Sequence, residues 1–513
     1  MTDARIPEDA IRLREKNTDI VNLNHEKSYP KFPSFRIVVV LLCFSACFCT
    51  NTSWFIMNFT LVCMVNTTYL ERSPEIPDPE NRTGPGNSTT DFCRRPVAEF
   101  QEYGGTFQWD RSMQSSILAA QSWGSLVSIL PAGFFLDNYG AKWIFIASSA
   151  LTAVTNLVIP LAARQGTGLL FAIRVVQGMG MELAWPVCIV AASRWFSSDE
   201  LGFLTALAAS GFPIGALFSM IVSGSFCGTL GWEAVFYLVG VLTALSTIAW
   251  WLLYANDPRG SRFTSASEKS FILDHRVYKL HRLAKPKIPW TKLAKSAPIW
   301  AIILVNVSNW YITAFVADFL PSYFKDVLSL GSTTNGLFSA LPFLMLLIGR
   351  IIAGLLSDWT DRCYNPTTSV RIFGAISGFP VAVLLVALTL FNCQQSSYAV
   401  VVLGIAYLCF GFAVGGFIKS SCLVAPPFSG FISCVSAGAS YLAGIAVPYI
   451  TEALTPDRSR AQWRNAFSLT AAVHAVGTVI FVSLSSGQLQ PWAEEDQLER
   501  LEKPKQTARL TVN

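Results

Sequence analysis

The chain has 513 residues, of which 52% are hydrophobic and only 14% are charged, and its mean hydropathy is +0.43. A soluble chain normally carries about 25% charged residues, so this composition excludes an ordinary soluble protein and predicts one that crosses a membrane many times. The formal net charge of +5 decides little, because orientation depends on which loops carry the Lys and Arg residues. The 12 cysteines show no CxxC or Cys/His ligand spacing, so we expect no metal site.

The N-terminal tail, residues 1–36, is polar and carries seven Lys or Arg residues. It lacks the apolar core of a cleavable signal peptide. The next segment, 37–65, is apolar and long enough to cross the bilayer as the first spanning helix. Basic residues collect on the cytosolic side of spanning helices, so we expect the N-terminus to lie in the cytosol.

The polar loop 66–111 contains Asn-x-Ser/Thr sequons at Asn66, Asn81 and Asn87, and its acidic residues outnumber its basic ones. Sequons are glycosylated on surface loops of secretory-pathway proteins. We therefore expect this loop to be glycosylated and to lie on the outer, luminal or extracellular side.

Eleven further apolar segments follow, each near the ~20 residues that cross a bilayer. They lie at 112–136, 141–163, 168–193, 200–224 and 232–254, and then at 298–323, 334–357, 370–391, 398–419, 425–450 and 464–485. The linker between the two groups, 255–297, carries ten Lys or Arg residues against three acids. Both this charge bias and the count of six crossings place the linker in the cytosol.

Twelve spans in two sets of six predict an all-α membrane protein with the layout of a major-facilitator transporter. The layout divides the chain into an N-terminal half, 37–254, and a C-terminal half, 298–485. The polar C-terminal tail, 486–513, would lie in the cytosol. Cys93, Cys227 and Cys393 all fall on the predicted outer side, where two of them can form a disulfide if the geometry allows it.

A short repeat supports the division into halves. G-x-x-x-D ends the second span at Gly133 and Asp137, and the eighth span at Gly354 and Asp358. Glycine lets neighbouring helices approach closely, and an Asp at a helix end can pair with a base in one conformation and release it in another. We expect these residues and Arg350 to form gates; the alternative is a turn that merely holds two helices together.

Motifs along residues 110–493 resemble those of the anion:cation symporters of the major facilitator superfamily. They include Arg174-x-x-Gln177-Gly178 with Pro186 and Trp195, Asp257-Pro258, Ser267-Glu268-Lys269-Ser270-Phe271-Ile272, Asn309-Trp310, Leu320-Pro321-x-Tyr323, Asn335-Gly336-Leu337 and Gln490-Pro491-Trp492-Ala493. The Asn309-Trp310 pair resembles the sialin and phosphate-transporter branch more than the glutamate branch, which tends to carry a basic residue there. The resemblance implies transport of a small anion with a cation.

The resemblance also implies that Arg174 helps to bind the anion. A charge inside a spanning helix is usually functional, and a guanidinium donates two parallel hydrogen bonds to a carboxylate or phosphate. The alternative is an Arg held permanently by a neighbouring acid or by carbonyl groups. We expect a substrate site formed by Arg174, Gln177, Asn309, Tyr311 and Asn58.

Three residues are candidates for ion coupling: Glu182, Asp318 and His474. The family carries its acid seven residues after the Arg, where this chain has Met181, and Glu182 lies about 100° further round a continuous helix. Glu182 can therefore miss the cavity. Asp318 is either a coupling acid or an interfacial residue, and His474 is either a coupling group or a packing residue.

Other polar positions of the family are replaced by Ile56, Ile189, Leu423 and Ala437, so the cavity is less charged than the resemblance implies. We expect a secondary transporter of a small organic anion or inorganic phosphate, driven by a proton or sodium gradient. The alternative is a transporter-like sensor or an orphan carrier of a neutral or weakly charged solute. No nucleotide-binding or catalytic motif is present, which predicts no enzyme, no cofactor and no nucleic-acid partner. We expect a monomer in the plasma membrane or a lysosomal or vesicular membrane.

Overall fold

A computed structural model describes residues 34–66, 105–129, 131–196, 201–275, 290–391, 393–425 and 428–493. Helices form almost all of this part of the chain, which confirms the all-α prediction. The N-terminal helix set consists of α2 (Phe35–Met64), α4 (Arg111–Ile129), α5 (Ala132–Gln165), α6 (Thr167–Met181), α7 (Ala184–Trp195), α8 (Leu201–Ala209), α9 (Gly211–Thr229) and α10 (Trp232–Leu253).

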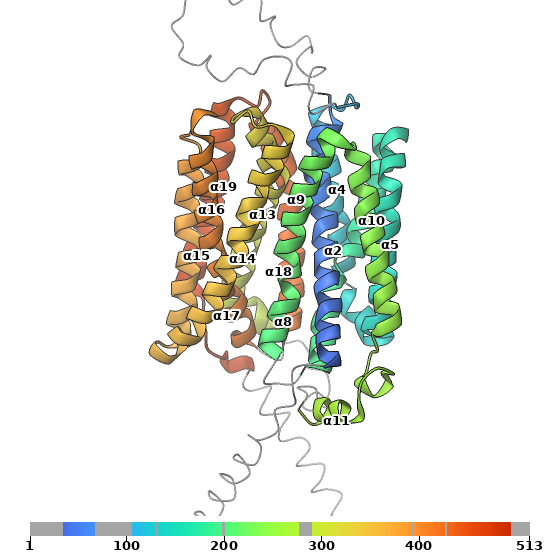
Figure 1. Cartoon of the computed structure of the whole chain (residues 1–513). Coiled ribbons are helices and arrows are strands. Elements are labelled where there is room, and N and C mark those ends of the chain that lie inside the picture. The colour runs from blue at the N-terminus through green and yellow to red at the C-terminus, as the bar shows by residue number, and fades with distance from the viewer. Residues whose placement is uncertain are drawn as a thin grey trace, which may run out of the picture.

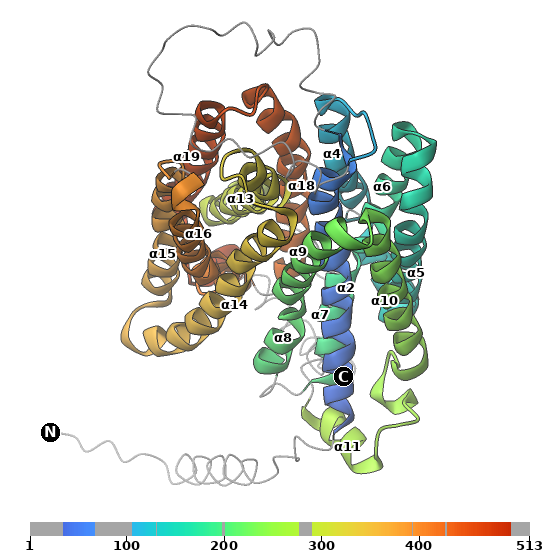
Figure 2. The ribbon, with the colours of Figure 1, turned by 45° about the horizontal axis from the view of Figure 1, so that its top comes forward.

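The C-terminal helix set consists of α13 (Ala297–Asp326), α14 (Ser332–Cys363), α15 (Pro366–Leu388), α16 (Ser396–Phe410), η7 (Gly411–Val414), α17 (Phe417–Val424), α18 (Ser429–Leu454) and α19 (Arg460–Leu484). Between the sets, the described parts of the linker form η4 (Pro258–Gly260), α11 (Ala266–His275) and α12 (Trp290–Ala294). Figure 1 shows the two sets side by side, and α9 packs against α14 and α4 against α18 where they meet (Figure 2).

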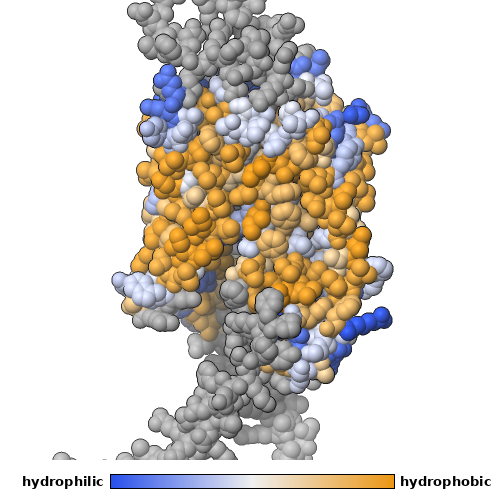
Figure 3. Space-filling model, in the orientation of Figure 1, coloured by the Kyte–Doolittle hydropathy of each residue, from blue (hydrophilic) through white to orange (hydrophobic). Residues whose placement is uncertain are grey.

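Eleven stretches of the described chain are long and apolar enough to cross a membrane. The remaining predicted span contains α4, whose many Ser and Gln residues make it less apolar and which packs against α6 and α18. Large apolar side chains such as Leu161 and Val383 are exposed. Together such residues form the apolar band between two polar rims in Figure 3. This band suits contact with lipid, because hydrocarbon offers no hydrogen-bond partners.

Several predicted spans contain a break. The chain kinks at Gly140, where φ is +77°, a conformation that glycine adopts without steric cost. This kink separates the second span from the third. The fourth span is divided at Glu182 and Leu183, between α6 and α7, and the fifth at Ser210, between α8 and α9. The tenth is divided by η7.

A disulfide joins Cys63 in the last turn of α2 to Cys227 in α9, with the two Cα atoms 6.1 Å apart. We call this end of the helices the outer end. Cys227, one of the three candidates, thus forms a disulfide, but its partner is Cys63, which lies within the first apolar span and was not among the candidates. Cys93 and the side chain of Cys393 lie outside the described residues.

The hydrophobic core shows that the two sets are closed against each other at the outer end. The largest cluster of buried residues includes Phe55 and Val235 of the N-terminal set together with Phe315 and Phe467 of the C-terminal set. Towards the inner end the core divides into two clusters. One contains residues of the N-terminal set and Ile272 of the linker, and the other belongs to the C-terminal set with its adjoining segments.

The linker helix α11 is tied to the inner end of α2 by Glu268. This carboxylate accepts hydrogen bonds from the Ser34 hydroxyl at 2.5 Å and from the backbone N–H groups of Phe35 and Arg36, each at 3.2 Å. The first N–H groups of a helix have no partner within the helix, and a negative charge there also favours the helix dipole. Glu268 therefore caps the first spanning helix from a distance of more than 200 residues in sequence.

Candidate functional site

The break between α6 and α7 follows from Pro186. A proline inside a helix clashes with the carbonyl group four residues earlier, which here belongs to Glu182. The chain turns at Glu182 and Leu183 before α7 begins. Glu182 directly follows the helical Met181 and keeps right-handed helical angles, so the predicted rotation from Met181 to Glu182 still holds, and Glu182 lies at the break itself.

Arg174 is fully buried, with 0% of its surface exposed, and a chain of polar side chains holds it. Its Nη1 donates to Gln177 Oε1 at 2.6 Å, Gln177 Nε2 donates to Asn156 Oδ1 at 2.7 Å, and Asn156 Nδ2 donates to Ser53 Oγ at 2.9 Å. The chain fixes the guanidinium from one side. Within the described part of the chain, Arg174 Nε and Nη2 have no hydrogen-bond partner.

Gly178 explains why α4 and α6 approach so closely. A Cβ at this position would lie 2.1 Å from the backbone oxygen of Gln121 in α4, a distance at which the two helices would have to move apart. Glycine at this point thus allows direct backbone contact. The contact brings the polar face of α4 next to the segment that carries Arg174 and Gln177.

Glu182 connects the two helix sets at the break between α6 and α7. The Tyr441 hydroxyl of α18 donates a hydrogen bond to Glu182 Oε2. The Tyr441 ring meets the edge of Trp310 of α13, and Trp310 stacks on Trp54 of α2 with 5.2 Å between ring centroids. Glu182 therefore faces the C-terminal set rather than lipid.

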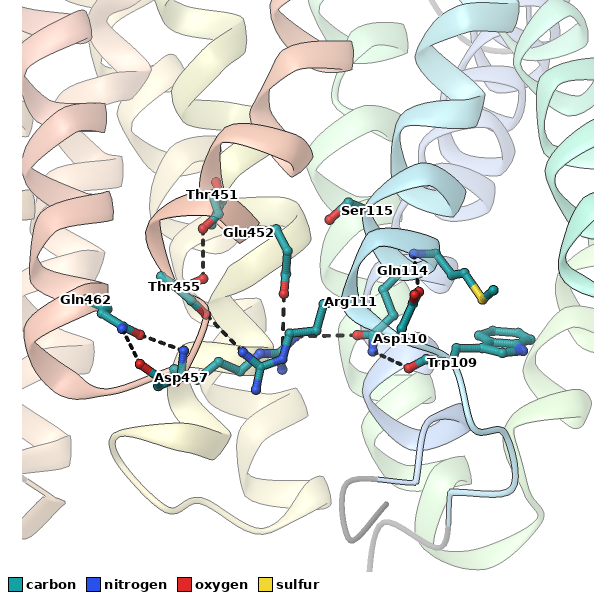
Figure 4. Close-up of polar contacts among 12 residues, drawn as sticks. Trp109, Asp110, Arg111, Gln114, Ser115, Thr451, Glu452, Thr455, Asp457 and Gln462 are labelled. Atoms are coloured by element: carbon teal, nitrogen blue, oxygen red, sulfur yellow. Dashed lines mark hydrogen bonds and ion pairs between the residues drawn. The ribbon is translucent and has the colours of Figure 1, made fainter. Parts of the chain in front are cut away.

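The outer ends of the two sets are joined by a second group of polar contacts (Figure 4). Arg111 Nε of α4 lies 3.7 Å from Glu452 Oε1 of α18, and Arg111 Nη1 donates to the backbone oxygen of Thr455 at 3.4 Å. Arg458 donates to Gln114 Oε1 at 3.4 Å and pairs with Asp326 Oδ2 at 3.7 Å. Arg458 makes these contacts with φ at +51°, which is uncommon for a residue other than glycine.

A small cleft lies between α2, α4, α13 and α18 beneath these contacts. Its polar lining comes from both sets: Asn58, Gln114, Ser115, Asp318, Ser322, Lys325, Glu452 and Arg458. Asp318 is 7% exposed, so it is buried between the sets and does not lie at the lipid surface. Its carboxylate interacts electrostatically with Arg174, although the two side chains form no ion pair within 4 Å.

Three other predicted site residues lie elsewhere. Asn309 donates to the backbone oxygen of Val305 at 2.7 Å and leaves its Oδ1 without a partner among the described residues. Tyr311 is buried in the large hydrophobic cluster and does not line the cleft. His474 Nε2 lies 3.3 Å from the backbone oxygen of Ser377, inside the C-terminal set. The structure thus brings Asn58 and Asp318 to one cleft, whereas Arg174, Gln177, Asn309, Tyr311 and His474 do not line it.

The predicted gate residues lie on α5 and α14. At Gly354 no atom of the described residues lies within 4 Å of where a Cβ would stand, so the predicted close helix contact at this glycine is wrong. Arg350 is half-buried on α14. The surroundings of Gly133 and the side chains of Asp137 and Asp358 are not described, and Asn81 and Asn87 lie outside the described residues; Asn66 follows the outer end of α2.

The sequence patterns did not identify several residues of the site. Asn156 and Trp54 lie in apolar spans and contact the site only through partners that are distant in sequence. Ser322 stands four residues after Asp318, and this helical spacing places both residues on one face of α13.

Comparisons with known proteins were made by sequence and by structure. A family model described as Major Facilitator Superfamily matches residues 43–429. The chain is 28% identical over 495 residues to the probable small intestine urate exporter of Mus musculus, covering 94% of this chain and 98% of that protein. It is 29% identical over 423 residues to sialin of Homo sapiens, covering 81% and 85% respectively.

A third relative is sodium-dependent phosphate transport protein 3 of Mus musculus, which is 27% identical over 477 residues, covering 92% of this chain and 98% of that protein. Among solved structures, a D-xylose–proton symporter superposes with a TM-score of 0.61 at 12% identity, covering 89% of this chain and 99% of that one. The inward open conformation of the xylose transporter XylE from E. coli also gives 0.61, at 11% identity, covering 88% and 96%. These similarities confirm the predicted fold.

Proposed function

Because the chain belongs to the Major Facilitator Superfamily, we propose that it moves a small organic anion or inorganic phosphate across a membrane by alternating access, driven by a proton or sodium gradient. The observation that carries this proposal is Arg174, which is fully buried and has two nitrogen atoms without a hydrogen-bond partner in the described residues. A buried charge needs compensation. A carboxylate or phosphate that accepts two hydrogen bonds would supply it.

The relatives support an anionic substrate, since their names include a urate exporter and a sodium-dependent phosphate transport protein. The closed outer end and the divided inner core support a state in which the substrate site communicates with the inner side. We further propose that both termini and the linker are cytosolic, and that the protein resides in the plasma membrane or a lysosomal or vesicular membrane. The Cys63–Cys227 disulfide supports an oxidising outer side.

The proposal is tested by uptake into proteoliposomes. A panel of organic anions and phosphate is offered under imposed proton and sodium gradients. For an anion that is transported, Arg174→Ala should lower the initial uptake rate at least about 30-fold, because truncating one partner of a buried charged contact costs about 2–5 kcal/mol. Arg174→Lys should retain part of the rate, because it keeps the charge but not the fork of donors.

Arg164 provides the matched control. It is an exposed arginine that pairs with Glu233 at 2.8 Å, away from the cleft, so Arg164→Ala should leave uptake close to that of the wild type. Transport of no anion under either gradient, or full uptake by Arg174→Ala, would overturn the proposal.

A second candidate is a sensor or a carrier of a neutral solute, favoured by Ile56, a fully buried apolar residue next to the cleft helix segment. Uptake of an uncharged solute that is insensitive to Arg174→Ala would favour this candidate.

A further inference from the structure

The outer cleft contains oxygen-bearing side chains that have no partner. Asp318 and Ser322 lie one turn apart on α13, both line the cleft and both are largely buried. No hydrogen bond or ion pair joins either side chain to another described residue. Their oxygen atoms are not among the buried atoms that lack a partner, so they keep contact with the cleft. They are therefore available to a ligand that enters it.

Asn58 faces the same cleft from α2. Its side chain is 1% exposed, and its Nδ2 has no hydrogen-bond partner in the described part of the chain. The oxygen and nitrogen atoms of an amide group are distinguished only by their hydrogen bonds. Since no bond fixes Nδ2, the amide oxygen can be the atom that faces the cleft. A carboxylate, a hydroxyl and an amide oxygen then line one cleft from two helix sets.

We propose that Asp318, Ser322 and Asn58 bind a sodium ion between the two helix sets, and that this ion competes with Arg174 for the charge of Asp318. Hard cations take oxygen ligands of these three kinds. The inference deepens the proposed function by assigning the coupling ion and its site, and its second part rests on that function.

The electrostatic interaction between Arg174 and Asp318 supplies the coupling. Without sodium, Asp318 is the charge opposite the guanidinium. Sodium neutralises the carboxylate, so Arg174 gains more by binding an anion. The reverse also holds, because a bound anion reduces the repulsion between Arg174 and the cation. Such coupling is reciprocal and typically changes each affinity by about 5–150-fold.

The other charges of the cleft do not replace sodium. Arg111 lies against Glu452, and Arg458 lies against Asp326, so two of the nearby bases already have acidic partners. Lys325 also lines the cleft, but it forms no ion pair with Asp318. The carboxylate of Asp318 therefore remains open to an added cation.

Thermal unfolding of the purified full-length protein in detergent tests the site without any transport measurement. Sodium chloride is titrated against choline chloride at constant ionic strength, with no substrate present. We expect the unfolding midpoint of the wild type to rise with sodium and to saturate. Asp318→Asn and Ser322→Ala should each raise the half-saturating sodium concentration at least about 10-fold. Glu233→Gln, which removes a half-buried acid of the outer side that pairs with Arg164, should match the wild type.

Arg174→Gln gives an effect of opposite sign. Loss of the competing cation should lower the half-saturating sodium concentration at least about 5-fold, while uptake of the anion is lost. Arg174→Lys keeps the positive charge and should bind sodium like the wild type. Equal stabilisation of Asp318→Asn and wild type, or equal stabilisation by choline and sodium, would refute the site.

If Asp318→Asn does not fold, Ser322→Ala and Asn58→Ala carry the test, and unchanged sodium affinity in both would refute the site. Sodium binding that is lost in Asp318→Asn while Arg174→Ala transports anions normally would overturn the proposed function and leave the sodium site in place. Anion uptake that requires Arg174, together with an unfolding midpoint that sodium does not change, would overturn the sodium site and leave the proposed function in place.

Discussion

Removal of the Glu268 carboxylate should destabilise the inner end of the N-terminal helix set. Glu268 and Arg36 are 3% and 2% exposed, and Arg36 Nε lies 3.6 Å from Glu268 Oε1. Loss of a helix cap costs about 1 kcal/mol, and breaking a buried ion pair costs about 3–5 kcal/mol. Because part of the capping energy is the same charge interaction, we expect Glu268→Ala to lower the free energy of unfolding by about 3–5 kcal/mol in total, and Glu268→Gln by less.

The buried cysteines of the same region provide the assay. Cys43 and Cys188 are in the inner core cluster of the N-terminal set, so a thiol reagent reaches them only when this end opens. Mass spectrometry measures the rate of their alkylation. Glu268→Ala should raise this rate at least about 100-fold, because each 1.4 kcal/mol of lost stability corresponds to a factor of ten. The double variant Ser34→Ala/Glu268→Ala should lose less stability than the sum of the two single variants, because the Ser34 hydroxyl donates to the same carboxylate; the further loss reflects the hydrogen bonds that Ser34 Oγ accepts from Arg36. Alkylation as slow as in Glu233→Gln would show that Glu268 does not hold this end together.

Two further predictions concern the contacts between helices. Tyr441→Phe removes the hydroxyl that donates to Glu182. For an ionised Glu182, this loss should weaken closure of the outer end by about 1.5–3 kcal/mol. A cysteine introduced by Ser115→Cys should then react faster with a thiol reagent added from outside, and an unchanged rate would contradict the prediction. Cys63→Ser should expose Cys227 to alkylation without reduction and lower stability by about 2–5 kcal/mol. Cys227→Ser should lower stability by the same amount, and the double variant by no more, because each of these variants removes the same disulfide bond.

The spans and the importance of Arg174 could be predicted because both depend on local sequence. A long apolar run predicts a helix that crosses the bilayer, and a charge within it predicts a site. The break at Glu182 was missed although Pro186 stands four residues later, because the fourth span was treated as a continuous helix. The pairing of Cys63 with Cys227 was missed because apolar context does not reveal which helix end lies beside another.

The partners of the site residues could not be predicted, because they are distant in sequence. Tyr441 and Glu182 are separated by 259 residues, and the contact exists only because α18 packs beside the α6–α7 break. At Gly354, by contrast, a local sequence motif predicted a contact that the described residues do not make. The G-x-x-x-D motif repeats that of the second span, yet the helix neighbours that would make the glycine necessary are not there in the described residues.

The contacts between the two helix sets have strengths that suit a carrier. The Arg111–Glu452 ion pair at 3.7 Å and the Arg458–Gln114 hydrogen bond at 3.4 Å join the two sets, and contacts of these kinds are typically worth about 1–2 kcal/mol each. Moving a two-state equilibrium from 1:99 to 99:1 takes about 5.5 kcal/mol of differential binding. Arg174 belongs to one set and Asp318 to the other, so the ligands proposed for them would act at the junction itself. An anion and a cation that bind there with a few kcal/mol of preference for one arrangement would suffice to exchange the open and closed ends.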